Sequence, residues 1–173
     1  MTPEAWLRGP VEGVTPELQP VAHALVQARE DLERIEPLLA DEKLWESPGQ
    51  AASAGFHLRH LAGSTDRLLT YARGEQLSQE QKRYLATEKE PQPDLSVEFL
   101  LAEVRDVLDR ALAHLRSVQG TTLDDERLVG RGKLPSNVRG LLYHAGEHAT
   151  RHMGQLITTL KVNRDRPPPH RSS

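Results

Sequence analysis

The chain of 173 residues contains no cysteine, and aromatic residues make up only 4% of it. The absence of cysteine excludes disulfide bonds and cysteine nucleophiles, and it favours a reducing cytoplasm as the location. No stretch approaches the ~20 consecutive apolar residues of a transmembrane helix. The first residues, from Met1 to Arg8, lack the apolar core of a signal peptide. We therefore expect a soluble, cytoplasmic protein with no membrane partner.

The chain also lacks an excess of positive charge. Lysine and arginine number 22 against 25 aspartates and glutamates, which gives a net charge of −3. No basic patch reaches the density that duplex binding requires, so nucleic acid is not an expected partner. Hydrophobic residues account for 37% of the chain, which is low but adequate for a helical bundle with long polar faces. The length suits one domain with a single core.

Apolar residues recur at helical spacing in four long segments, which predicts long helices at about 16–40, 50–73, 95–119 and 136–161. Ser78 and Gln81 resemble a capping box at the start of a shorter helix, over about 78–87. Ser136 is the predicted N-cap of the last long helix. The segment 121–135 is predicted to be irregular, with a very short extended pair as the alternative.

These elements predict an all-α protein folded as an antiparallel four-helix bundle, because such bundles place four amphipathic helices around one core. We place the bundle domain at residues 16–163. An irregular arm at 1–15 precedes it, and its Trp6 and Leu7 are expected to pack on the body or on a partner subunit. The proline-rich tail, 164–173, is expected to be disordered.

Three histidines stand four residues apart near the C-terminus: His144, His148 and His152. On an α-helix this spacing places them in one column, and i,i+4 neighbours can aim at a common point. Neutral imidazole binds Zn, Ni, Fe or Cu, so a metal site is one interpretation, and a histidine-rich exposed helix is the other. The zincin pattern H-E-x-x-H is absent, and Glu147 lies about 100° around the helix from His148. A catalytic site would need a further ligand from elsewhere in the chain.

The second predicted helix supplies candidates for that ligand, His57 and His60. Gly63 and Ser64 follow His60 by one turn and would leave space beside its ring, where Arg67 could hold an anionic ligand. The alternatives are buried, hydrogen-bonded core histidines and a surface arginine. Ferritin-like di-iron bundles need Glu-x-x-His pairs, and none occurs in this sequence, so a mononuclear three-histidine site is left.

Two segments together resemble the signatures of the DinB-like superfamily, which includes the YfiT-type thiol transferases. The segment from His144 to Gln155 is similar to its closing signature, and the segment from Phe56 to Ser64 is similar to its helix 2 signature. The likeness spans roughly 16–163, with the signatures in the right order and on the right helices. It implies a four-helix bundle that often forms a homodimer.

The resemblance also implies a divalent metal ion held by one histidine of helix 2 and two of the last helix. By position these are His60, His148 and His152, with His57 as the rival to His60. His144 is then expected to line the pocket or to support a ligand. The metal expected in a purified sample is Zn or Ni, with Fe or Mn as alternatives.

Known activities of the superfamily are transfers of low-molecular-weight thiols such as bacillithiol, mycothiol or glutathione. The resemblance therefore implies a metal-dependent thiol S-transferase that acts on an electrophilic small molecule. Pocket candidates beside the metal are His144, Arg67 and Gln155. A metal-dependent hydrolase that activates water would use the same ligands. A non-catalytic, stress-related metal-binding dimer is the alternative from another functional class.

Overall fold

The computed structural model describes residues 2–164 and consists mainly of four long helices. In chain order the helices are α1 (Gln19–Ile35), α2 (Ala54–Ala72), α3 (Gln79–Thr87), α4 (Val97–Ser117) and α5 (Val138–Arg164). A two-stranded antiparallel sheet of β1 (Glu126–Val129) and β2 (Leu134–Asn137) lies between α4 and α5 in the sequence. Single 3-10 turns stand at Ala5–Leu7, Pro16–Leu18, Glu36–Leu38, Asp41–Lys43 and Gly120–Thr122. The predicted four-helix bundle is confirmed.

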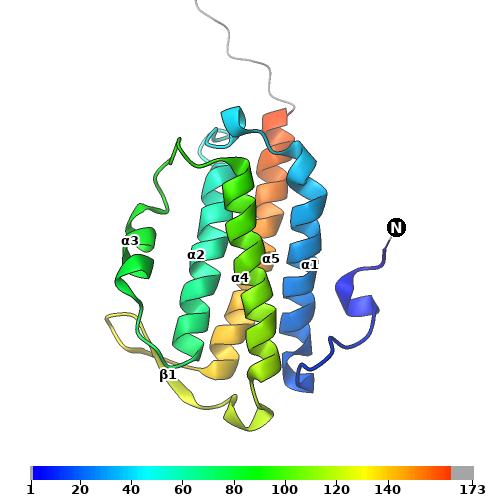
Figure 1. Cartoon of the computed structure of the whole chain (residues 1–173), viewed down its shortest axis with the longest axis vertical. Helices are drawn as coiled ribbons and strands as arrows, with labels where there is room; N and C mark the ends of the chain where they lie inside the picture. Colours follow the sequence, from blue (N-terminus) through cyan, green and yellow to red (C-terminus); the bar gives the residue numbers. More distant parts are fainter. Residues whose placement is uncertain (1, 165–173) are drawn as a thin grey trace, which may run out of the picture.

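The four long helices form a square in which α2 packs on α5 and α4, and α1 also packs on α5 and α4 (Figure 1). Helices α1 and α5 run in one direction along the bundle, and α2 and α4 run in the other (Figure 1). Two of the neighbouring pairs are therefore antiparallel, as expected, whereas the pairs α1/α5 and α2/α4 are parallel. The long connection over residues 73–96, which includes α3, returns the chain to the end where α2 began and makes the parallel pair possible.

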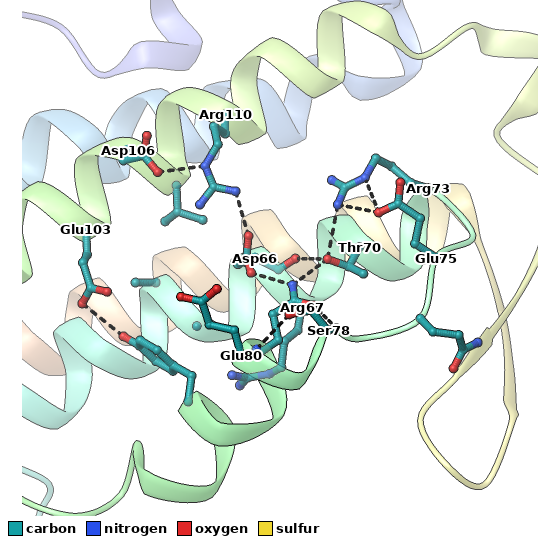
Figure 2. Close-up of a pocket in the computed structure, with 16 residues that line it drawn as sticks. Asp66, Arg67, Thr70, Arg73, Glu75, Ser78, Glu80, Glu103, Asp106 and Arg110 are labelled. Carbon is teal, nitrogen blue, oxygen red and sulfur yellow. Dashed lines mark hydrogen bonds and ion pairs between the residues drawn. The ribbon is translucent and has the colours of Figure 1, made fainter.

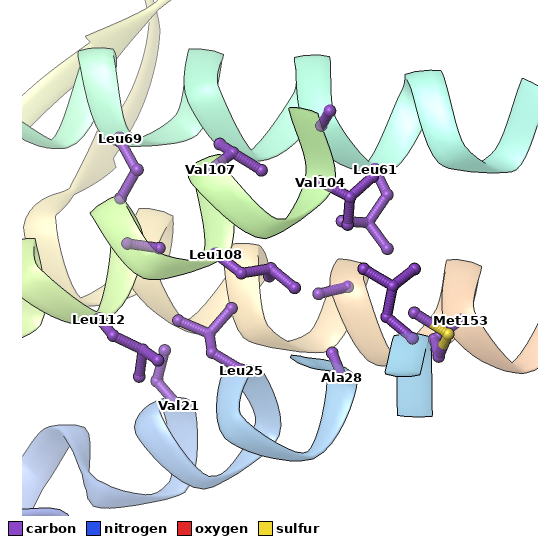
Figure 3. Close-up of a cluster of buried hydrophobic side chains, with 14 of the residues drawn as sticks. Val21, Leu25, Ala28, Leu61, Leu69, Val104, Val107, Leu108, Leu112 and Met153 are labelled. Atoms are coloured by element: carbon purple, nitrogen blue, oxygen red, sulfur yellow. The ribbon is translucent and has the colours of Figure 1, made fainter. Parts of the chain in front are cut away.

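The core fills the centre of this square with branched aliphatic side chains. Figure 3 shows Leu25 of α1 and Leu108 of α4 pointing into the same layer, with Met153 of α5 at one end. All three are almost fully buried. Burial of such side chains from four amphipathic helices is the main stabilising contribution of the fold.

Local capping residues set where the helices begin. Helix α2 begins at Ala54, four residues later than predicted, because the Ser53 hydroxyl caps it by accepting a hydrogen bond from the Phe56 amide at 3.2 Å. The capping box of α3 is present, with reciprocal bonds between Ser78 and Gln81. Helix α5 begins at Val138 rather than at 136, since residues up to Asn137 pair in the sheet.

The irregular segments differ in part from expectation. The segment 121–135 holds most of a β-hairpin, so the alternative of a short extended pair is the observed one. In the arm, Trp6 and Leu7 are 62% and 59% exposed, and the neighbouring Ala5 is buried instead. The predicted disordered tail lies almost wholly outside the described residues. Within residues 2–164, no helix is long and apolar enough to cross a membrane.

Candidate metal centre

Three histidines from two helices meet between α2 and α5. His60 projects from α2, and His148 and His152 project from adjacent turns of α5. Each offers one ring nitrogen, and these three nitrogens all lie within 4.8 Å of one another. The Nε2 atoms of His60 and His148 are 2.9 Å apart, and the ring centres of His148 and His152 are 4.4 Å apart. The structure thus brings together the three residues that the family resemblance implies as ligands.

The His60 ring is oriented by a buried carboxylate. Its Nδ1 atom lies 2.8 Å from Oε1 of Glu88, which follows the last residue of α3. Glu88 binds Arg67 as well, through Arg67 Nη1 to Oε2 at 2.9 Å and Arg67 Nη2 to Oε1 at 3.1 Å. An ionised carboxylate only accepts hydrogen bonds, so His60 carries its proton on Nδ1. The lone pair of a neutral ring is then on Nε2, which faces the other histidines.

His57 lies beside the group, one turn from His60 on α2. It is buried, and its Nδ1 atom is 3.2 Å from Nδ1 of His152. This contact occupies Nδ1 of His152 and leaves Nε2 of that ring for another partner. In this arrangement His57 supports His152 and is not itself in the group of three.

Three rings at this site, those of His57, His148 and His152, are held in their neutral form. Burial, followed by the charges of neighbouring histidines, lowers the pKa of His152 to about 3. The same causes, in the same order, lower the pKa of His57 and of His148 to about 4. Neutral imidazole is the form that binds a metal, so no proton has to leave these rings at pH 7.

The geometry fits a divalent metal ion. Three imidazole nitrogens within 4.8 Å of one another are a donor set that divalent Zn, Ni or Fe accepts. Phe56 stacks on the His60 ring at 5.2 Å, with the ring planes 10° apart, and forms an apolar wall beside the group. His60 and His148 are only half-buried, so the group can be reached from solvent.

The pocket candidates of the sequence lie in different places. His144 is close to the site, with its ring centre 5.1 Å from that of His148, and its half-exposed side chain pairs with Glu147. Gln155 is exposed. Arg67 does not face an open space beside His60 as expected, because both of its terminal nitrogens bind Glu88. The anion that Arg67 holds is a carboxylate of the chain itself.

A separate polar pocket of about 500 Å³ lies between α2, α3 and α4, and Arg67 forms part of its wall (Figure 2). The other two arginines in its lining are also paired with carboxylates. Arg110 binds Asp66 and Asp106, and Arg73 binds Glu75 (Figure 2). None of the three histidines of the cluster lines this pocket. This pocket is therefore distinct from the metal centre. Each arginine in its lining is already paired with a carboxylate, so none is free to bind an anionic substrate.

The sequence did not reveal Glu88, which directly follows the short helix predicted over about 78–87. Nothing in its sequence neighbourhood signals burial, since Thr87, Lys89 and Glu90 are exposed. Gly63 was a partial signal of a close neighbour. Glycine inside a helix is less stable than alanine, and close packing of another group against that position is one reason to find it there. The expected open space above Gly63 is filled by Tyr84, Arg67 and Glu88.

Comparisons with known proteins agree with this architecture. Among solved structures, the chain is similar to YfiT from Bacillus subtilis, with a TM-score of 0.58 and 16% identity over 90% of this chain and 91% of that chain. YfiT is described as a probable metal-dependent hydrolase with an unusual four-helix bundle topology. At this identity the likeness concerns the fold.

No curated protein matches the chain. The model of the DinB superfamily matches residues 24–156, which is more than half of the chain. The chain therefore belongs to the DinB superfamily.

Proposed function

We propose that the chain is a metal-dependent enzyme whose divalent ion is held by His60, His148 and His152. The observation that carries the proposal is the convergence of one nitrogen from each of these residues to within 4.8 Å. Zn and Ni are the metals we expect in a purified sample, with Fe and Mn as alternatives. Imidazole suits Zn, Ni and Fe, whereas Mn prefers oxygen ligands.

The reaction that we propose is transfer of a low-molecular-weight thiol, such as bacillithiol, mycothiol or glutathione, to an electrophilic small molecule. A bound divalent ion would supply positive charge that favours the thiolate form of a thiol, and neutral histidine ligands leave that charge undiminished. The chain has no cysteine, so the reacting sulfur has to come from a cosubstrate. Phe56, stacked on His60, offers an apolar surface for the acceptor.

Two features weigh on the choice of reaction. Arg67 was expected to hold an anionic ligand, such as a carboxylate of a thiol cosubstrate. It does not support this role, because both of its terminal nitrogens bind Glu88. The description of YfiT as a probable metal-dependent hydrolase favours a second candidate, in which the same residues serve the hydrolysis of an ester or amide. A non-catalytic metal-binding dimer remains the third candidate.

Loading the protein with Zn, Ni, Mn or Fe and offering a halogenated aromatic or a bimane with each thiol tests the proposal. We expect a conjugation rate above the uncatalysed one that is lost with a chelator and lost in His148→Ala. The matched control is His23→Ala on α1, outside the cluster, which should retain the rate. No acceleration with any thiol, together with metal-dependent cleavage of an ester or amide panel, would move the assignment to a hydrolase.

We also propose that the chain forms a homodimer. The support within residues 2–164 is the arm, where Trp6 and Leu7 expose 62% and 59% of their surface. Burial of such apolar side chains at an interface is favourable. Light scattering at micromolar concentration should give twice the chain mass of 19.4 kDa, and Trp6→Ala should weaken the dimer. A mass near 19.4 kDa for the unaltered protein would contradict the proposal.

A further inference from the structure

Glu88 is a buried carboxylate that touches the candidate metal centre from a third structural element. Only 1% of its surface is exposed, although it belongs to the connector between α3 and α4. Its Oε1 atom is 2.8 Å from His60 Nδ1, and Arg67 donates hydrogen bonds to both of its carboxylate oxygens. Burial alone would raise the pKa of the Glu88 carboxyl, but the hydrogen bonds from His60 and Arg67 outweigh it and lower the pKa below its usual value. The contacts with Arg67 and His60 therefore make Glu88 the hydrogen-bond acceptor for His60 Nδ1.

Helix α2 is shaped to admit this carboxylate. A methyl group at Gly63 would lie 2.6 Å from Cε1 of Tyr84, 2.8 Å from Nη1 of Arg67 and 2.9 Å from Oε2 of Glu88. Real Cβ atoms do not approach other atoms so closely, and the whole ion pair would have to move to admit one. The absence of a side chain at position 63 thus creates the space in which Glu88 and Arg67 meet.

The end of α3 is also tied to α2 by contacts that fix the position of Glu88. Arg59, which is buried, donates from Nη1 to the Thr87 carbonyl at 2.8 Å. Its guanidinium carbon lies 4.6 Å from the centre of the Tyr84 ring, and the Tyr84 hydroxyl donates to the Arg59 carbonyl at 3.2 Å. The backbone immediately before Glu88 is therefore held on α2 independently of the ion pair.

We propose that Glu88, fixed by Arg67, is the positioning residue of His60 in the metal centre, because it sets the His60 ring so that Nε2 faces His148. This inference rests on the proposed metal site. A carboxylate that accepts from the far nitrogen of a ligand histidine fixes both the tautomer and the orientation of the ring, and loss of such a partner typically weakens metal binding 10- to 100-fold. The α3 segment, which contributes no ligand, thereby becomes part of the centre.

The test uses the double variant Arg67→Met with Glu88→Leu, which removes the acceptor without leaving one buried charge unpaired. The first measurement is the affinity for Zn²⁺ by competition with a chelator, and we expect it to fall by about 10- to 100-fold. The second is the ¹⁵N spectrum of the histidine rings in the metal-free protein. Wild-type His60 should carry its proton on Nδ1, and the double variant should lose this preference. If the ion pair had a purely structural role, the double variant would keep the same His60 tautomer as the wild type.

Gly63→Ala is a second variant that displaces the ion pair without removing it, and it should also weaken Zn²⁺ binding. Its matched control is Gly154→Ala on α5, where an added methyl meets nothing within 4 Å. Glu90→Gln, in the same connector as Glu88 but exposed, is the control for the loss of a carboxylate. Both controls should bind Zn²⁺ as the wild type does.

The outcomes separate this inference from the function on which it rests. If the wild type binds Zn²⁺ and the double variant binds it equally tightly with His60 still protonated on Nδ1, the role of Glu88 is overturned and the metal site stands. The Nε2 tautomer of His60 in the metal-free wild type would overturn the role of Glu88 in the same way. If the wild type binds no divalent ion, the proposed function is overturned and the role of Glu88 with it.

Discussion

Replacing His148 by alanine is expected to abolish stoichiometric binding of a divalent ion, because two remaining imidazoles do not complete a three-ligand site. Elemental analysis and titration with Zn²⁺ should show one ion per chain in the wild type and none in His148→Ala. A ligand that binds only the folded state stabilises it by RT ln(1 + [L]/Kd), or about 2.7 kcal/mol when the free ion is at 100 times its Kd. Zn²⁺ should therefore raise the melting temperature of the wild type and leave that of His148→Ala unchanged.

Two controls sharpen this result. His23→Ala, on α1 and away from the cluster, should bind one ion per chain with unaltered affinity. His144→Ala should also keep the stoichiometry, since His144 lies outside the group of three. One ion per chain in His148→Ala, with wild-type affinity, would contradict the proposed ligand set.

The same titration decides between His57 and His60. The structure predicts that His60→Ala loses the ion, because His60 offers a nitrogen to the group. His57→Ala should instead keep one ion per chain and bind it about 10- to 100-fold more weakly, because His57 supports the ring of His152. The reverse pattern would mean that His57 is the ligand from α2.

The sequence predicted those features that depend on neighbours along the chain. The helical periodicity, the capping box at Ser78 and the i,i+4 pair of His148 and His152 are all local patterns, and each appears in the structure. The predicted start of α2 was four residues too early. Residues 50–52 carry no periodic signal that distinguishes the last residues of the loop from the first turn of the helix. The choice of Ser53 as cap became visible only in the structure.

Features that depend on contacts between distant segments could not be predicted in the same way. The contact between Glu88 and His60 joins α2 to the far end of α3, and periodicity carries no information about it. The parallel directions of α2 and α4 likewise follow from the path of residues 73–96, which return beside α2 to the end where α2 began (Figure 1). Arg67 was correctly placed one to two turns beyond His60, but its partner was taken to be a ligand because Glu88 was not recognised as buried.

Acidification from pH 7 to pH 5 is expected to destabilise the metal-free protein. In the folded state the pKa values of His57 and His148 are about 4 and that of His152 is about 3. In an unfolded chain a histidine has a pKa of about 6.5. Between these values the unfolded chain binds more protons than the folded protein, so the free energy of unfolding rises with pH in this window. Stability is fully present above pH ~6.5 and is lost progressively as the pH falls towards 4.

Urea unfolding at pH 7, 6 and 5, after removal of metal by a chelator, measures this dependence. His57, His148 and His152 can together take up about three protons on unfolding. The contribution of His148 should be smaller than that of a fully buried ring, because this side chain is only half-buried and water screens its charge. His57→Gln, which cannot titrate, should flatten the slope. A free energy of unfolding that is constant from pH 7 to pH 5 would show that the buried rings are protonated or rearranged in the folded state. In the metal-loaded protein the same acidification should also weaken binding, because protons then compete with the ion for the ring nitrogens.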